Sequence, residues 1–300
     1  MRLLWNRFRA DRSAVFGAVV AGLLVLLAIT APLLTALEGQ DTTSFHNDLV
    51  DSARGGVPLG GFGGISPQHW FGVEPQTGRD LFARIAEGAQ VSLLVAICAT
   101  LVEVLLGVAV GLLAGLSGKL VDALLSRVTD IAIAFPVTVF SLALLAIVPE
   151  TFPRPLLVAV VIGVFGWGGT ARITRAQALS LRTRDFVAAA RLSGASGWRV
   201  ARREILPGLA APVITYGALL LPTNLIAEAG LSFLGVGVRP PTSSWGQMLS
   251  SATTWFRSDP VYVLLPAFMV FLTVLSFTLF GEGVRIALDP RSTRLSRKAA

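Results

Sequence analysis

The sequence predicts an all-α integral membrane protein with about six transmembrane helices and both termini in the cytoplasm. Hydrophobic residues fill 53% of the 300 positions and charged residues only 14%, well below the roughly 25% of a soluble domain. Charges are missing from long stretches, each close to the roughly 20 apolar residues that a bilayer-spanning helix needs. The predicted spans are residues 13–37, 88–118, 131–149, 155–171, 205–227 and 260–281.

The first span could instead be the apolar part of a signal peptide, because basic residues precede it. Its charge-free run of 25 residues exceeds the about 7–15 residues usual for such a segment. We therefore expect a retained helix at residues 13–37, after a cytoplasmic segment at residues 1–12. Cys98 is the only cysteine and lies in the second span, so no internal disulfide is possible.

The distribution of basic residues predicts how the chain lies in the membrane. Nineteen of the 25 Lys and Arg fall before the first span, after the last one, in the 119–127 connection or between the fourth and fifth spans. Cytoplasmic segments of membrane proteins are enriched in Lys and Arg, so these four segments are expected inside. The arginines lack interleaved aromatic residues, which argues against a nucleic-acid partner.

Two longer segments are expected on the outer side. Residues 38–87 carry seven acids and three bases and are rich in Gly and Pro, which predicts a mostly irregular loop ending in a surface helix at residues 80–87. Residues 230–259 begin with the apolar GLSFLGVGV and continue with the turn-rich RPPTSSWG. The first part could simply end the fifth span, but the glycine spacing and the proline pair favour a stiff bend.

The sequence does not point to catalysis by this chain. A nucleotide-binding loop is not formed by GLLAGLSGKL, because Leu113 stands where its first glycine is needed. His46 and His69 are the only histidines, and both lie in the outer loop, where we expect surface residues and no metal site. No pattern indicates a nucleophile–His–acid triad.

Three acids fall within or at the edges of the predicted spans. Glu103 lies in the middle of the second span, where an unpaired carboxylate costs a few kcal/mol. It is the candidate intramembrane polar residue, expected to face a partner helix or an aqueous path. Asp130 and Glu228 lie near span ends, where interfacial water solvates a carboxylate, so a structural role is expected for both.

The stretch DFVAAARLSGASGWRVARREILP, residues 185–207, predicts two short helices joined by a turn. Gly194 suits a left-handed helix end and Ser196 suits the N-cap of the second helix. Pro207 and Pro212 are expected to mark where that helix gives way to the fifth span. An amphipathic loop on anionic headgroups would explain the arginines equally well, but not the fixed distance from the glycine turn to ILP.

That spacing resembles the cytoplasmic loop of binding-protein-dependent ABC importer permeases, which carries Glu-Ala-Ala, three residues, Gly, and later Ile-x-Leu-Pro. Here AAARLSG supplies Ala189, Ala190 and Gly194, and EILP supplies Leu206 and Pro207. Ala188 replaces the usual Glu, and Glu204 replaces the Ile, with Ile205 one place later. The other matching stretches are LWNRFRADRSAVFG, HWFGVEPQTGRDLFARIAEGAQVSL, AEAGLSFLGVGVRPPTSSWGQML and GEGVRIALDPR, and they resemble the C-type permease of dipeptide, oligopeptide and nickel importers.

The resemblance implies a permease subunit that moves di- or oligopeptides across the bacterial cytoplasmic membrane by alternating access. Its implied partners are a B-type permease subunit in a heterodimer, two ATPase domains, an extracytoplasmic substrate-binding protein and membrane lipid. ATP and Mg would bind to the ATPase subunits, so this chain would hold no cofactor. A nickel complex or glutathione is the alternative cargo, and a self-sufficient channel or secondary transporter is the rival class.

The resemblance also divides the chain. Residues 88–284 would form the transmembrane core of five helices, with a coupling loop at 172–207 and an outer scoop at 230–259, followed by a basic cytoplasmic tail at 285–300. The implied ATPase-coupling residues are Phe186, Ala189, Ala190, Arg191, Gly194, Ala195, Trp198, Arg199, Leu206 and Pro207. The implied residues of the outer gate and binding-protein side are Leu231, Phe233, Leu234, Gly235, Arg239, Pro240, Pro241 and Trp245.

Overall fold

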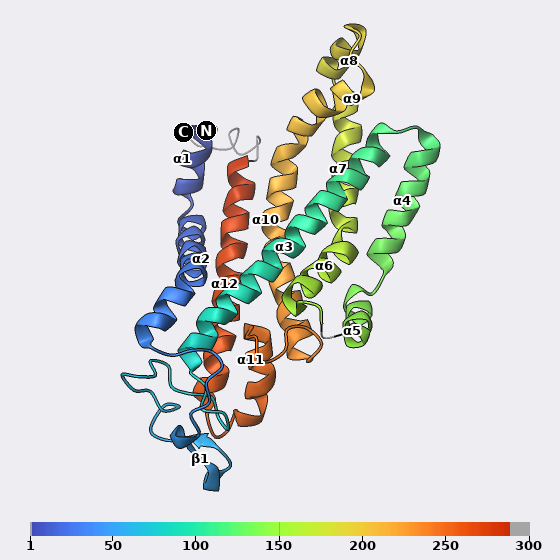
Figure 1. The fold of residues 1–300 in the computed structure, drawn as a ribbon. Coiled ribbons are helices and arrows are strands. Elements are labelled where there is room, and N and C mark those ends of the chain that lie inside the picture. Colours follow the sequence, from blue (N-terminus) through green and yellow to red (C-terminus); the bar gives the residue numbers. More distant parts are fainter. Residues whose placement is uncertain (1, 150, 289–300) are drawn as a thin grey trace.

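The computed structural model describes residues 2–149 and 151–288 (Figure 1). The part of the predicted basic tail from residue 289 onward lies outside this range. Four helical segments of the described chain are long and apolar enough to cross a membrane. They are α2 (Arg12–Glu38), α3 (Leu81–Leu116), the segment Gly197–Phe233 that ends with α10 (Leu206–Phe233), and α12 (Pro260–Leu288).

Two further spans are broken in the middle. Helices α4 (Lys119–Ala134) and α5 (Val137–Ile147) meet at 77°, and α6 (Arg154–Gly166) and α7 (Gly168–Arg182) meet at 44°. The described chain thus has up to six spans if each bent pair counts as one. This agrees with the all-α membrane fold predicted from the sequence, but the third and fourth spans are not single straight helices.

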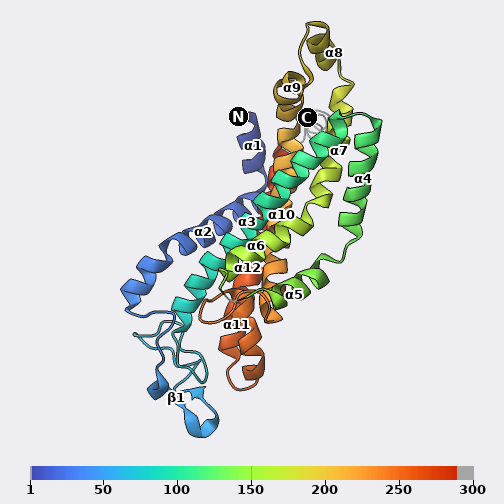
Figure 2. The ribbon, with the colours of Figure 1, turned by 45° about the vertical axis from the view of Figure 1, so that its right-hand side comes forward.

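The remaining elements lie at the two ends of the helical bundle (Figures 1 and 2). At one end are α1 (Arg2–Ala10), α8 (Asp185–Leu192), α9 (Gly197–Val200) and the π-helical turn η3 (Ala201–Ile205). At the other end are the short strands β1 (Val50–Asp51) and β2 (Val57–Pro58), the helix α11 (Trp245–Ala252), and the 3₁₀ turns η1 (Asn47–Leu49), η2 (Ser52–Arg54) and η4 (Thr253–Trp255). The strands pair antiparallel, with Val50 opposite Pro58.

Helix α2 shows why the first span starts and stops where it does. The Asp11 carboxylate accepts hydrogen bonds from the backbone N–H groups of Ser13 and Ala14, so it caps the first turn. At the other end Gly39 adopts φ 83°, the left-handed conformation that commonly ends a helix. The long apolar run between these two signals therefore forms one helix.

Helix α3 runs diagonally through the bundle and packs closely against α7 (Figure 1). Three glycines at four-residue spacing in α3, Gly107, Gly111 and Gly115, form the contact stripe. A Cβ added at Gly107 would lie 2.4 Å from Thr170 Cβ, and one at Gly111 would lie 2.5 Å from the Ala171 carbonyl oxygen. Small residues at this spacing allow close helix packing in a membrane, where burying apolar side chains against lipid gives little advantage.

The structure corrects two expectations about helix boundaries. The segment 80–87 is not a surface helix; α3 begins at Leu81, and residues from Leu81 to Ala86 are all buried. The segment 119–127 is not a loop connection, because α4 begins at Lys119 and carries it. In the first case Arg84 is buried because internal partners satisfy its charge, which the sequence pattern alone does not reveal.

The expected break at Pro207 and Pro212 is also absent. The chain runs helically from α9 through η3 into α10, with Pro207 in the first turn of α10 and Pro212 inside that helix. The π-helical turn η3 directly precedes Leu206 and Pro207, so the helix is locally adjusted where the proline lacks its N–H. Membrane helices also accommodate internal prolines, because local helix adjustments satisfy the released carbonyl groups.

Candidate functional site

Residues 185–205, here called the tip element, project from one end of the bundle (Figure 1). Helix α8 ends at Leu192, and Gly194 follows with φ 80°. The Ala195 N–H donates to the Ala190 carbonyl oxygen at 3.0 Å, the long hydrogen bond of a Schellman helix end. The Ser196 hydroxyl then accepts from the Arg199 N–H at 3.4 Å and caps α9. The predicted helix–Gly–helix geometry is confirmed at both residues.

The tip element is fastened to the bundle by a small apolar core. Val187, Val200 and Ile205 from the tip element are buried against Ala178 of α7 and Leu209 of α10. The outward surface therefore has a defined position relative to the spans. A force applied to the tip element would reach α7 and α10 directly.

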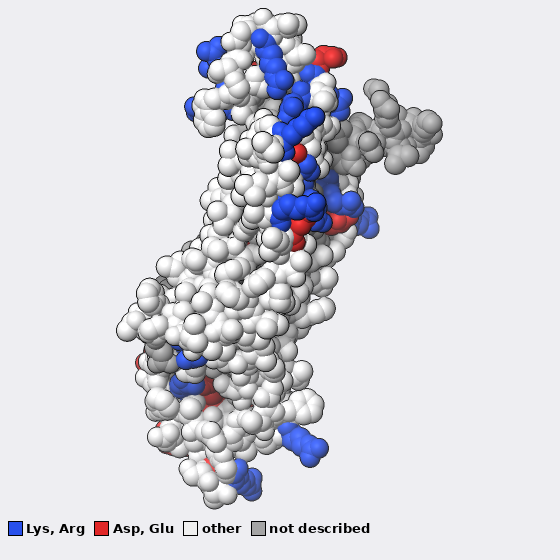
Figure 3. All heavy atoms as spheres, turned by 90° about the vertical axis from the view of Figure 1, so that its right-hand side faces the viewer, with Lys and Arg blue, Asp and Glu red and all other residues white. Residues whose placement is uncertain are grey.

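The outward surface combines apolar and basic side chains. Leu192 is 90% exposed and Trp198 is 75% exposed, and Phe186 is 45% exposed. Lys and Arg gather over this end of the molecule and are sparse at the opposite end (Figure 3). The predicted coupling residues Ala189, Arg191, Arg199, Leu206 and Pro207 are exposed as well, while Ala190 and Ala195 are half-buried against the small core. Sequence reasoning did not include Leu192, the most exposed apolar residue of the tip.

At the opposite end the outer scoop begins with a second helix end of the same kind. Helix α10 stops at Phe233, Gly235 adopts φ 78°, and the Val236 N–H donates to the Leu231 carbonyl oxygen at 3.2 Å. The bend predicted in GLSFLGVGV is therefore real. Of the predicted residues here, Leu231 is buried, whereas Phe233 and Leu234 are exposed.

Trp245, which the resemblance implied as a residue of the outer gate and binding-protein side, does not face solvent. Its side chain is fully buried, and its indole N–H donates to the Ile85 carbonyl oxygen at 3.1 Å. A Cβ at Gly88 would lie 2.8 Å from the Trp245 ring, and a Cβ at Gly246 would lie 2.4 Å from the Ala229 carbonyl oxygen. The glycines of α3 and α11 thus let α11 wedge between α3 and α10.

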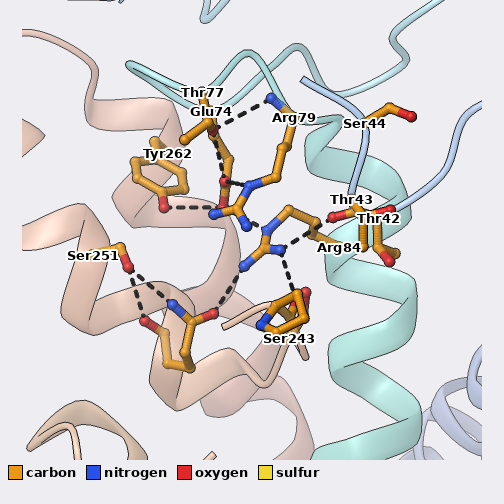
Figure 4. Close-up of polar contacts among 12 residues, drawn as sticks. Thr42, Thr43, Ser44, Glu74, Thr77, Arg79, Arg84, Ser243, Ser251 and Tyr262 are labelled. Atoms are coloured by element: carbon orange, nitrogen blue, oxygen red, sulfur yellow. Dashed lines mark hydrogen bonds and ion pairs between the residues drawn. The ribbon is translucent and has the colours of Figure 1, made fainter. Parts of the chain in front are cut away.

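A buried polar network holds the scoop to the outer loop (Figure 4). Arg84 is fully buried and donates to Glu74 at 2.6 Å and to Gln247 at 2.9 Å. Glu74 also accepts from Arg79 at 2.8 Å and from the Tyr262 hydroxyl at 3.0 Å. One ion-pair network therefore joins the loop, α3, α11 and α12. The sequence analysis missed it, because Arg84 and Glu74 are ten residues apart with no pattern linking them.

A cavity opens beside this scoop. It has a volume of about 750 Å³ and lies between the scoop and the start of α6. Its walls include the predicted scoop residues Arg239, Pro240 and Pro241, facing Phe152 and Arg154. Four of the eight predicted outer-gate residues, Gly235, Arg239, Pro240 and Pro241, line this cavity, which is of a size that can hold a small solute. The other four do not line it: Leu231, Phe233, Leu234 and Trp245.

Glu103 lies in the middle of the bundle and faces a partner helix, one of the two environments expected for it. It is 3% exposed, and the Asn224 side-chain amide donates to it at 3.2 Å and to Thr100 at 3.1 Å. A Cβ at Gly166 would lie 1.8 Å from the Glu103 carboxylate, so the break between α6 and α7 sits against this acid. Glu103 therefore connects α3, α6 and α10 inside the membrane-spanning part.

Glu228 is not solvated at the interface, contrary to the expectation from its position. It is fully buried near the end of α10 and accepts from the Ser232 hydroxyl at 2.8 Å. Its second carboxylate oxygen is buried and has no hydrogen-bond partner among the described residues. Asp130 behaves as expected: it is half-exposed and pairs with Arg172 at 2.9 Å.

The outer loop is held by local carboxylates. Hydrogen bonds from the Ser44 side chain and the backbone of Ser44 and Thr43 hold the pKa of Asp41 well below its usual range. Burial raises the pKa of Asp259, which directly precedes α12 and lies beside Gly63 of the outer loop. His69 is buried rather than exposed, with its Nδ1 at 2.8 Å from Asp80. Across the described residues, no group of three or more His, Cys, Asp or Glu is placed to hold a metal ion.

The fold and these sites define a class of protein. Long apolar helices, two broken spans, a buried acid between helices and a cavity at one end are typical of a multi-pass transport subunit. The protruding tip exposes apolar and basic side chains together, a combination that is typical of a docking surface.

Comparison with known proteins identifies the family. Residues 107–294 match the binding-protein-dependent transport system inner membrane component, and residues 1–49 match the N-terminal transmembrane domain of oligopeptide transport permease C. The chain belongs to this family of ABC importer permeases, as the sequence motifs predicted. It is thus a transport subunit, and ATP hydrolysis in such importers takes place on a separate subunit.

Several relatives match along nearly the whole chain. A dipeptide transport system permease protein of Alkalihalophilus pseudofirmus is 34% identical over 97% of this chain and 90% of its own length. A glutathione transport system permease protein of Pectobacterium atrosepticum is 33% identical over 97% of this chain and 91% of its own length. A solved chain of the inward-facing MetNI methionine ABC transporter has a TM-score of 0.54 and 18% identity, covering 68% of this chain and 96% of that chain. That structure supports the fold alone.

Proposed function

We propose that this chain is the C-type permease subunit of a peptide importer in the bacterial cytoplasmic membrane. The two permeases that match along most of the chain carry dipeptides and glutathione, and glutathione is itself a tripeptide. Peptides are therefore the cargo favoured over a nickel complex. The chain would work with a B-type permease subunit, two ATPase domains that bind ATP and Mg, and an extracytoplasmic binding protein.

The observation that carries this proposal is the tip element. Its Schellman end at Gly194 presents Phe186, Leu192 and Trp198 outward among arginines, at the end where basic residues gather. Exposed apolar side chains surrounded by charge mark a protein-docking surface. The positive-inside rule favours a cytoplasmic position for the same end, where an ATPase subunit would be available.

The opposite end fits the other half of the transport cycle. The cavity of about 750 Å³ beside the scoop would receive the solute from a binding protein. The network around Arg84 and Glu74 ties that cavity to the long helices α3 and α12. Helices α3 and α10 run from the scoop region toward the end that carries the tip element, and α7 leads directly into the tip element (Figure 1). Closure of the ATPase domains would thereby open or shut the path between subunits.

Co-purification tests the docking role directly. In the double variant Phe186→Ser/Leu192→Ser, we expect the chain to insert into the membrane at normal levels and to lose most of its bound ATPase subunit. The matched control is Phe62→Ser/Ile65→Ser, which changes two residues that are 80% and 54% exposed at the opposite end. Normal ATPase recovery in the tip variant, or equal loss in the control, would reject the docking surface.

A further inference from the structure

We propose that the groove between α1, α10 and α12 is a binding site for one anionic phospholipid. The groove has a volume of about 440 Å³ and lies at the same end of the bundle as the tip element. Its lining residues are apolar and come from three helices: Trp5, Phe8, Ile214, Phe280, Val284 and Leu288. An acyl chain matches this lining, whereas a peptide or a nucleotide would leave its polar groups unsatisfied.

The groove is held open by the way α1 rests on α12. The Phe8 ring lies edge-on to Phe280 with centroids 5.9 Å apart. A Cβ at Gly283 would lie 2.2 Å from Ala14 Cβ and 2.9 Å from the Phe8 ring, so only glycine permits this approach. Trp5 stacks on Phe8 and remains 59% exposed over the groove. The packing of α1 on α12 therefore fixes the walls of the groove, and the groove between them stays open to the surroundings.

The charges beside the groove favour an anionic headgroup. Helix α1 and the start of α2 carry Arg7, Arg9 and Arg12, and the one acid among them, Asp11, is engaged in capping α2. Arg9 lies over the Trp5 ring at 5.7 Å and is exposed, as is Arg12. Among the described residues neither Arg9 nor Arg12 forms an ion pair. A phosphodiester would find Arg9 against the Trp5 wall of the apolar groove, and Arg12 four residues after the lining residue Phe8.

An apolar groove with arginines beside it differs from the ordinary contact between a membrane helix and the surrounding lipid. Exposed apolar residues cover much of α2 as well, for example Ile29, which is 71% exposed. Helix α2 carries no Lys or Arg after Arg12. Each basic residue at the headgroup level favours an anionic lipid by about fivefold, so we expect selection by charge at the α1 groove.

Native mass spectrometry of the full-length chain, with its co-purifying transporter subunits, tests the site. The complex is mixed with equal amounts of phosphatidylglycerol and phosphatidylcholine carrying the same acyl chains. With two arginines beside the groove, we expect phosphatidylglycerol to be retained about thirtyfold over phosphatidylcholine. Arg9→Gln/Arg12→Gln should abolish this preference, and Ile214→Trp, which fills the groove from an exposed position, should remove the retained lipid.

The matched control is Ile29→Trp, which adds the same bulk to an exposed position of α2 and should keep the wild-type preference. Equal retention of the two lipids by the wild type would overturn the proposal, as would a preference that survives Ile214→Trp. Equal retention of the two lipids is also the result expected if a partner subunit covers the groove in the complex. If the double arginine variant does not assemble, the lipid preferences of Ile214→Trp and Ile29→Trp are compared instead. Loss of the retained lipid in Ile214→Trp alone supports the site, and equal retention in both variants overturns it.

Discussion

The indole N–H of Trp245 donates to the Ile85 carbonyl oxygen at 3.1 Å, directly over Gly88 of the same helix α3. This contact joins two segments that lie 160 residues apart in the chain. The outer scoop is therefore an internal part of the helical bundle and not a flap on its surface. Movement of α3 must carry α11 with it.

The first prediction tests the close packing of α11 between α3 and α10. In Gly246→Ala the new Cβ would meet the Ala229 carbonyl oxygen at 2.4 Å, so we expect overpacking to destabilise the protein by about 1–3 kcal/mol. Gly230→Ala is the control, because nothing lies within 4 Å of its Cβ. Thermal unfolding in detergent should show a lower midpoint for the first variant only. If Gly246→Ala unfolds at a temperature equal to or higher than Gly230→Ala, α11 is not packed this closely against α10.

Part of this arrangement could be predicted from the sequence, and the reason is local chemistry. The turn at Gly194 and the cap at Ser196 depend on residues within a few positions, so their signals are readable in the chain itself. Trp245, Arg84 and Glu228 were misplaced or missed, because their environment is set by partners far away in sequence. An arginine that pairs internally looks the same in a sequence as one that faces water.

The second prediction compares the two arginines that share Glu74. Arg84 is fully buried and Arg79 is more exposed, at side-chain exposures of 0% and 11%. Removing one partner of a buried pair costs about 3–5 kcal/mol, so Arg84→Met should strongly lower the free energy of unfolding. Arg79→Met should have a smaller effect, because Glu74 keeps its bonds to Arg84 and Tyr262. Chemical denaturation of the two variants measures the free energy of unfolding of each. An equal loss of stability in both would mean that Arg84 contributes no more to the network than Arg79 does.

The third prediction separates a structural role of Glu103 from a charged one. Glu103→Gln keeps an oxygen that can accept from Asn224, so we expect near-normal uptake and stability. Glu103→Ala leaves the Asn224 amide short of an acceptor and opens a gap beside Gly166, which should destabilise the bundle by about 1–3 kcal/mol. Uptake lost in the glutamine variant with stability intact would show that the negative charge itself is used in transport.

The fourth prediction fixes orientation. In a Cys98→Ala background, cysteine placed at Ser196 should react with membrane-impermeant thiol reagents only from the cytoplasmic side. Cysteine placed at Gln68, an exposed residue of the outer loop, should react only from outside. Labelling of intact cells reports cysteines that face outside, and labelling of opened cells also reports those that face the cytoplasm. The reverse pattern would place the tip element on the wrong side for an ATPase partner.

The fifth prediction isolates the backbone at Gly194. No atom lies within 4 Å of an added Cβ, so the demand for glycine comes from φ 80° alone. Leucine at this conformation costs about 1–2 kcal/mol, whereas asparagine tolerates it much better. We expect Gly194→Leu to weaken ATPase recovery and Gly194→Asn to retain it, at equal membrane levels. Equal recovery of the ATPase subunit in both variants would mean that the Schellman turn is not needed for docking.

The central claim is that this chain moves peptides only when a separate ATPase drives it. The most direct measurement is uptake of a labelled dipeptide into proteoliposomes that contain this chain, its co-purifying permease subunit and the binding protein, with and without the ATPase subunits. The account predicts uptake against a gradient only when both ATPase subunits and ATP are present. Uptake at the same rate without the ATPase subunits would contradict it and would indicate a channel or a secondary transporter.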